Sequence, residues 1–96
     1  MEKTFKLQIL SVSVKVAEAD VTSLVAPKEL GYVGILADHA PFLAKVTAGK
    51  IIFRDNSGKL TTLHSEAKGF LEVLRNKVAI LLESMPGERH EKQERR

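Results

Sequence analysis

Apolar and polar side chains alternate along the first part of the chain, and this alternation constrains the fold more than any other feature. The apolar positions are odd within residues 5–9 and even within residues 12–16: Phe5, Leu7 and Ile9, then Val12, Val14 and Val16. A period of two places successive side chains on opposite faces of a β-strand, so each segment predicts a strand with one buried face. The change of phase predicts a bend or bulge near Leu10 and Ser11 that turns the inward face.

Further runs rich in β-forming residues continue to residue 83. They cover residues 21–26, 34–36, 42–46, 50–54, 60–64, 70–73 and 78–83. Pro27 is expected to end the first of these runs, because proline donates no backbone hydrogen bond. Residues 55–58 predict a hairpin turn, and Asn76 is expected to take a positive φ between the last two strands. Residues 78–82 lack alternation, which is typical of a strand covered on both faces.

About eight to ten short strands, with no convincing amphipathic helix before residue 84, predict an all-β fold, either an antiparallel sandwich or a barrel. The 96 residues suffice for one domain, expected over residues 1–86, and 44% hydrophobic residues exclude a disordered chain. Residues 87–96 are almost wholly polar and are expected to form a disordered tail or a frayed helix. The apolar runs are too short to span a membrane, and the N-terminus shows no signal-peptide core.

The residues that carry chemistry give little sign of an enzyme, and we expect no catalytic residue, metal or cofactor. The chain has no cysteine, and its three histidines lack the short spacing of metal ligands. Asp38 and His39 are the one adjacent pair with catalytic potential, although neighbours on extended backbone point apart. The net charge of +3 comes from scattered lysines, without interleaved aromatics, which does not favour nucleic acid. A small-ligand or nucleic-acid binding module and a small enzyme using Asp38 and His39 remain alternatives.

Two blocks of the sequence resemble a known family. Residues 29–43 read E-L-G-Y-V-G-I-L-A-D-H-A-P-F-L, and residues 49–51 read G-K-I. Residues 68–73 read K-G-F-L-E-V, and residues 76–81 read N-K-V-A-I-L. These blocks, in this order and at these gaps, resemble the epsilon subunit of the F-type rotary ATP synthase, whose members typically read E-G-x-x-G-I-x-P-x-H-A-P-L-L and G-G-F-x-E-V…N-x-V-x-V-L. The resemblance covers nearly all of residues 4–83.

The resemblance implies a flattened antiparallel β-sandwich of two roughly five-stranded sheets. It implies a non-catalytic subunit of the central stalk of a proton-translocating synthase, which binds the gamma subunit and the c-ring and helps couple ring rotation to ATP synthesis. The expected location is the cytoplasmic face of the bacterial inner membrane, or the equivalent organellar membrane. The subunit would be peripheral there, with no membrane insertion and no nucleic-acid partner.

The resemblance also assigns site residues. It implies that Tyr32, Asp38 and His39 contact the partners, and Ser11 matches a gamma-facing position of the family. The residues expected to shape the loop are Gly31, Gly34, Ala40 and Pro41. The chain departs from the family pattern at Tyr32, where many members carry an acidic residue, and at residues 37–38, which are Ala-Asp instead of Pro-Gly.

Many members of the family continue into a C-terminal helical hairpin that restrains ATP hydrolysis and in some cases binds ATP. Residues 88–96 offer no apolar face from which such a hairpin could form. A natural product that stops at Arg96 is therefore expected to lack this inhibition and ATP sensing, or to show them weakened.

Overall fold

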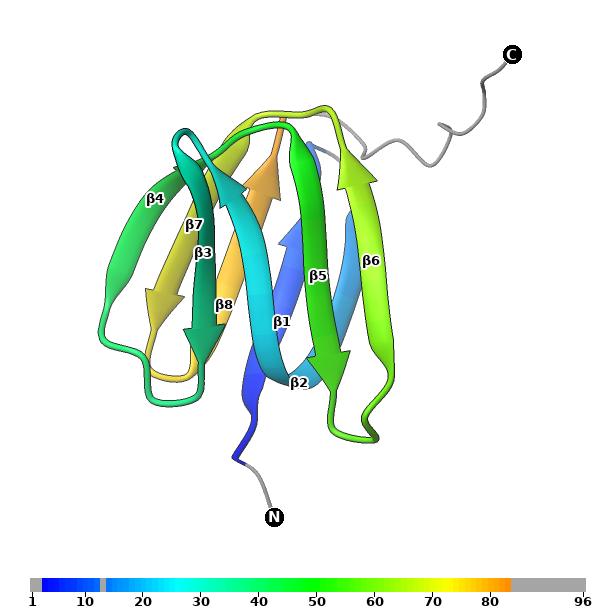
Figure 1. The fold of residues 1–96 in the computed structure, drawn as a ribbon, viewed down its shortest axis with the longest axis vertical. Coiled ribbons are helices and arrows are strands. Elements are labelled where there is room, and N and C mark those ends of the chain that lie inside the picture. The colour runs from blue at the N-terminus through cyan, green and yellow to red at the C-terminus, as the bar shows by residue number, and fades with distance from the viewer. Residues whose placement is uncertain (1–2, 13, 84–96) are drawn as a thin grey trace.

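The computed structural model describes residues 3–12 and 14–83, and these residues form eight β-strands and no helix (Figure 1). The expected polar tail at residues 87–96 lies outside the described residues. The strands are β1 (Phe5–Leu10), β2 (Lys15–Lys28), β3 (Gly31–Leu36), β4 (Phe42–Val46), β5 (Gly49–Asp55), β6 (Leu60–Ser65), β7 (Gly69–Leu74) and β8 (Lys77–Leu82).

The strands form two layers that share β2, a strand of 14 residues. The first part of β2 pairs with β1 and completes the layer β4-β7-β8-β1-β2. The second part pairs with β3 on one side and β5 on the other, and completes the layer β3-β2-β5-β6. The all-β sandwich is thus confirmed, but its layers of five and four strands belong to one continuous hydrogen-bonded sheet. The pairing is antiparallel except between β1 and β8, which run parallel.

The core lies between the two layers and follows the alternation of the sequence. On β7 every second residue is buried, from Gly69 to Val73. The odd positions of β1 are buried in the same way, as the period of two predicts. Both layers supply fully buried aliphatic side chains, among them Leu7, Ile9, Leu71 and Ile80 from one and Leu24, Ile35 and Ile51 from the other.

The expected change of phase near Leu10 is present, because the pairing of β1 with β2 shifts register between Ile9 and Leu10. The second half of that expectation, the inward series Val12, Val14 and Val16, is wrong for two of its three residues. Val12 lies in the β1–β2 connection with 78% of its surface exposed, and Val14 is exposed as well. Val16 is partly buried against the core, and the first fully buried side chain after the bulge is that of Val21.

The sequence predicts that Pro27 ends its strand, and this prediction is wrong. β2 continues to Lys28, and Pro27 lies opposite Tyr32 in the pairing with β3. Proline is tolerated in a strand where its missing N–H is not required, and its carbonyl oxygen still accepts a hydrogen bond from the Thr47 N–H at 3.1 Å. The two strands expected at residues 12–16 and 21–26 are therefore replaced by one.

The last hairpin confirms one expectation and corrects another. Asn76 has a φ of 59° and its neighbour Arg75 one of 54°, so the two-residue turn has the positive angles that suit the twist of a β-hairpin. The expectation that β8 is covered on both faces is wrong, because half of the Leu81 surface is exposed. The run of apolar residues arises because β8 carries aliphatic side chains on its outer face too.

The close approach of β7 to β8 requires glycine at position 69. A Cβ added to Gly69 would lie 1.9 Å from the Leu81 carbonyl oxygen, whereas one added to Gly34 would meet nothing within 4 Å. We expect Gly69→Ala to lower the free energy of unfolding by about 1–3 kcal/mol or more, because the backbone of β8 must move. Gly34→Ala is the control and should change it by less than about 0.5 kcal/mol. Urea unfolding of both variants, followed by circular dichroism, measures this; equal losses would contradict it.

Candidate functional site

The connections between strands gather at two opposite rims of the sandwich (Figure 1). We call the rim formed by residues 37–41, 56–59 and 75–76 the lower rim, and the rim formed by residues 11–12, 14, 29–30, 47–48 and 66–68 the upper rim. Of the residues expected to touch partners, Asp38 and His39 lie at the lower rim. Tyr32 and Ser11 lie at the upper rim. The structure therefore does not bring the four together.

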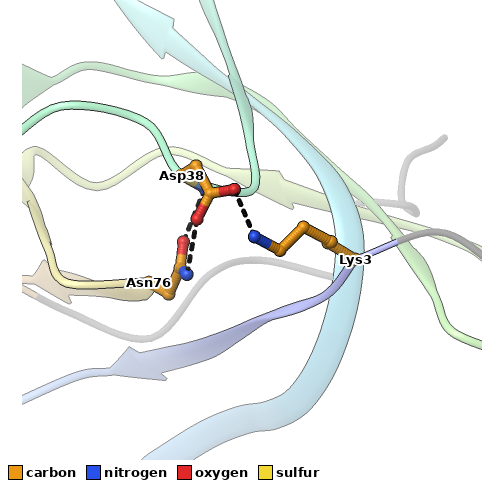
Figure 2. Close-up of polar contacts among 3 residues, drawn as sticks. All are labelled: Lys3, Asp38 and Asn76. Carbon is orange, nitrogen blue, oxygen red and sulfur yellow. Dashed lines mark hydrogen bonds and ion pairs between the residues drawn. The ribbon is translucent and has the colours of Figure 1, made fainter.

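Asp38 and Asn76 form a reciprocal pair at the lower rim (Figure 2). The Asp38 backbone N–H donates to Asn76 Oδ1 at 2.6 Å, and Asn76 Nδ2 donates to Asp38 Oδ1 at 2.9 Å. Both residues have a positive φ, 65° for Asp38, which aspartate and asparagine tolerate better than most residues do. The pair joins the β3–β4 connection to the β7–β8 turn, two segments that are far apart in the sequence.

Lys3 adds a third segment to this cluster. Its Nζ donates to Asp38 Oδ2 at 2.6 Å, as Figure 2 shows, and both side chains are more than half exposed. The hydrogen bonds from Lys3 and then Asn76, together with the lysine charge, hold the pKa of Asp38 below its usual value, against a smaller opposing effect of desolvation. We call Lys3, Asp38 and Asn76 the rim clamp.

His39 follows the clamp but makes different contacts. Its Nδ1 lies 2.7 Å from the Ala40 carbonyl oxygen, and its ring packs edge-on against Phe42 with the centroids 5.5 Å apart. Because a carbonyl can only accept, this hydrogen bond places the ring proton on Nδ1 and leaves Nε2 as an acceptor in the neutral ring. The Asp38 carboxylate bonds Lys3 and Asn76 instead of His39, so the two residues are not arranged as a catalytic dyad.

The other residues expected at the site are dispersed. Gly31 has a φ of 119°, which explains a glycine at the start of β3. Gly34 lies within β3 opposite Val25 and has no positive φ, so the expectation that it shapes a loop is wrong. Ala40 and Pro41 do lie in the loop, between β3 and β4. Ser11 donates its backbone N–H to the Val14 carbonyl at 2.9 Å.

A surface that the sequence analysis missed lies on the outside of the five-strand layer. Phe70 on β7 stands directly opposite Leu81 on β8, and both are about half exposed. Leu43 on β4 is 70% exposed and faces Glu72, between Phe70 and Leu74. These four apolar side chains form what we call the outer apolar face: Leu43, Phe70, Leu74 and Leu81. The apolar run at residues 78–82 was the signal that could have revealed it. The four side chains surround Glu72, and exposed apolar side chains grouped in this way on one face of a sheet mark a candidate protein-docking site.

The described residues offer little else that could hold a ligand. Among residues 3–12 and 14–83, no three histidine or carboxylate side chains come together as metal ligands do. Within the same residues there is no helix long and apolar enough to cross a membrane.

The rim clamp should make the stability of the protein depend on pH. The pKa of Asp38 is lower in the folded protein than the ordinary aspartate value of 3.8, so the ionised carboxylate stabilises the fold. This stabilisation is fully present above pH 3.8 and is lost as the pH falls through the folded-state pKa. We therefore expect Asp38→Asn to lower Tm at about pH 7, by an amount that shrinks as the pH falls below the ordinary value. Thermal unfolding of the variant and the wild type over this pH range tests the expectation. A difference in Tm that is independent of pH would contradict it.

Comparison with known proteins identifies the family. Residues 4–86 match the model of the β-sandwich domain of the ATP synthase delta/epsilon chain. The chain is 36% identical over 78 residues to an ATP synthase epsilon chain of Desulfatibacillum aliphaticivorans, covering 81% of this chain and 55% of that one. It is 37% identical over 90 residues to that of Desulfitobacterium hafniense, covering 93% of this chain and 67% of the other. The chain thus spans about half to two thirds of the length of these relatives.

The fold agrees with this similarity. A chain in the cryo-EM structure of the Euglena gracilis mitochondrial ATP synthase, OSCP/F1/c-ring, superposes with a TM-score of 0.80 at 21% identity, over 96% of this chain and 60% of that chain. The family match over residues 4–86, the two epsilon-chain relatives and the shared sandwich lead to one assignment. This chain belongs to the family of ATP synthase delta/epsilon chains and comprises its β-sandwich domain.

Proposed function

We propose that this chain is a non-catalytic rotor subunit of a proton-translocating F-type ATP synthase, which binds the gamma subunit and the c-ring and helps couple ring rotation to ATP synthesis. The observation that carries the proposal is the outer apolar face, on a domain that belongs to the epsilon-chain family. An enzyme would need a cluster of reactive groups, whereas Asp38 and His39 each bond other partners. A rotor subunit needs rigid contact surfaces, and interdigitated layers supply that rigidity.

We assign the outer apolar face to the gamma subunit. Phe70 and Leu81 are cross-strand neighbours, and Leu81 also lies opposite Leu10 on β1, so the apolar row crosses three adjacent strands. Burial of such side chains against a partner is favourable in proportion to the apolar area removed from water. His39 lies in the loop that leads into β4, and Ser11 follows Leu10, so both residues adjoin strands of this layer. We therefore place His39 and Ser11 in the gamma interface.

Tyr32 is assigned to the c-ring. It lies at the upper rim, near the start of β3, and β3 separates it from the loop that carries Asp38. Six residues of extended strand span roughly 20 Å, so Tyr32 and Asp38 lie at opposite rims. The Tyr32 hydroxyl lies beside Gly49, where an added Cβ would be 3.1 Å from it, and the side chain is otherwise more than half exposed. In this arrangement the subunit touches gamma along one face and the ring at the upper rim.

The proposed location follows from the proposed partners. A subunit held by gamma and the c-ring is peripheral to the membrane, at the cytoplasmic face of the bacterial inner membrane or the equivalent organellar membrane. Isothermal titration calorimetry and native mass spectrometry of this chain with the matching gamma subunit test the proposal. A one-to-one complex supports it, and the absence of a complex between folded partners contradicts it.

The assignment of the outer apolar face gives a sharper prediction. We expect Leu81→Lys to weaken gamma binding at least about tenfold, because a charge would be buried at the centre of the contact. Leu60→Lys is a matched control, because Leu60 is 52% exposed, against 50% for Leu81, and lies on β6 in the other layer. Calorimetric titrations with gamma compare the two, after thermal unfolding has shown that both variants fold. Equal affinities would rule out this face as the gamma site.

A further inference from the structure

We infer that Asp38 is a positioning residue: together with Asn76 and Lys3 it holds the β3–β4 connection in the shape in which His39 meets the gamma subunit, and it does not itself contact a partner. This inference rests on the proposed function. It replaces the expectation from sequence that Asp38 is a contact residue.

The first argument is that the polar atoms of Asp38 are already engaged within the chain. Oδ1 accepts from Asn76, Oδ2 accepts from Lys3, and the backbone N–H donates to Asn76. These bonds use part of the acceptor capacity of the carboxylate and fix its orientation toward donors of the same chain. The same atoms connect three separate segments of the chain.

The second argument is the backbone conformation. Asp38 has a φ of 65°, a conformation that costs free energy for residues other than glycine and persists where surrounding contacts stabilise it. The contacts that stabilise it here come from Asn76, which is itself anchored to the sheet because the Lys6 N–H donates to the Asn76 carbonyl at 3.0 Å. The clamp therefore connects the loop to the first residues of β1.

The third argument is the place of His39. It is the residue directly after Asp38, and its ring is oriented by the Ala40 carbonyl and by Phe42. The backbone at position 38 sets the direction in which the chain enters this arrangement. A change in the clamp therefore alters His39 without any direct contact between the two side chains.

The first measurements use four variants of the 96-residue chain. Asn76→Gly removes both side-chain bonds to Asp38 and keeps a residue suited to positive φ, and Asp38→Gly removes the carboxylate in the same way. Asp38→Asn is the conservative variant, because its amide oxygen still accepts from Asn76. Glu18→Gln is the control, because it breaks the exposed Lys15–Glu18 ion pair, which lies away from the lower rim. Its length of 2.6 Å equals that of the Lys3–Asp38 pair.

Two measurements decide the outcome. Amide hydrogen exchange by NMR reports the Asp38 N–H directly, and we expect Asn76→Gly to speed its exchange several-fold, up to about tenfold, while Glu18→Gln leaves it unchanged. Titration with gamma should show weaker binding for Asn76→Gly and Asp38→Gly. Asp38→Asn should keep most of the wild-type affinity for gamma. High salt should speed amide hydrogen exchange in the β3–β4 connection of the wild type, because salt screens the exposed Lys3–Asp38 ion pair.

A double-mutant cycle separates positioning from contact. If Asp38 acts through His39, Asp38→Gly should cost no further gamma affinity once His39→Ala is present. Additive losses would show that Asp38 touches the partner and would overturn the inference, as would unchanged exchange in Asn76→Gly. If the wild type does not bind gamma, the proposed function fails, and with it the role in docking. The exchange rates would still decide whether the clamp holds the loop.

Discussion

The long strand β2 is the constraint on which the rest of the structure depends. Its first part belongs to one layer and its second part to the other, so the two layers cannot shift relative to each other without breaking β2. The register change between Ile9 and Leu10, and a second one between Val21 and Ser23, give the sheet the local twist it needs to fold onto itself. The aliphatic core then fills the space between layers that are already covalently joined.

Some features of these layers can be predicted from the sequence, and others cannot. The period of two identifies the inward residues of β1 and β7, because each strand reports its own buried face. It fails at Val12 and at Leu81, because alternation shows which residues share a face but not whether that face is covered. Val12 follows the alternation but lies in an exposed connection, and Leu81 departs from the alternation on an exposed face of the sheet.

The candidate site shows the same limit. The motif around residues 29–43 directs attention to Asp38 and His39, and their position in a loop is visible from the neighbouring proline. The partner of Asp38 is not visible, because Asn76 reaches it only after β7 and β8 have paired and their turn has taken positive φ angles. Contacts of this kind depend on tertiary register, so the sequence alone assigns Asp38 to contact with a partner protein. The structure instead gives it internal partners.

The parallel pairing of β1 with β8 has a consequence for biosynthesis. β1 is the first strand of the chain to leave the ribosome, yet it lies between β2 and β8, so one of its two edges stays open until residues 77–82 have emerged. Pairings between strands so distant in sequence form slowly, and an unpaired edge is a template for aggregation. That edge of β1 is therefore open to wrong pairing until β8 closes the layer.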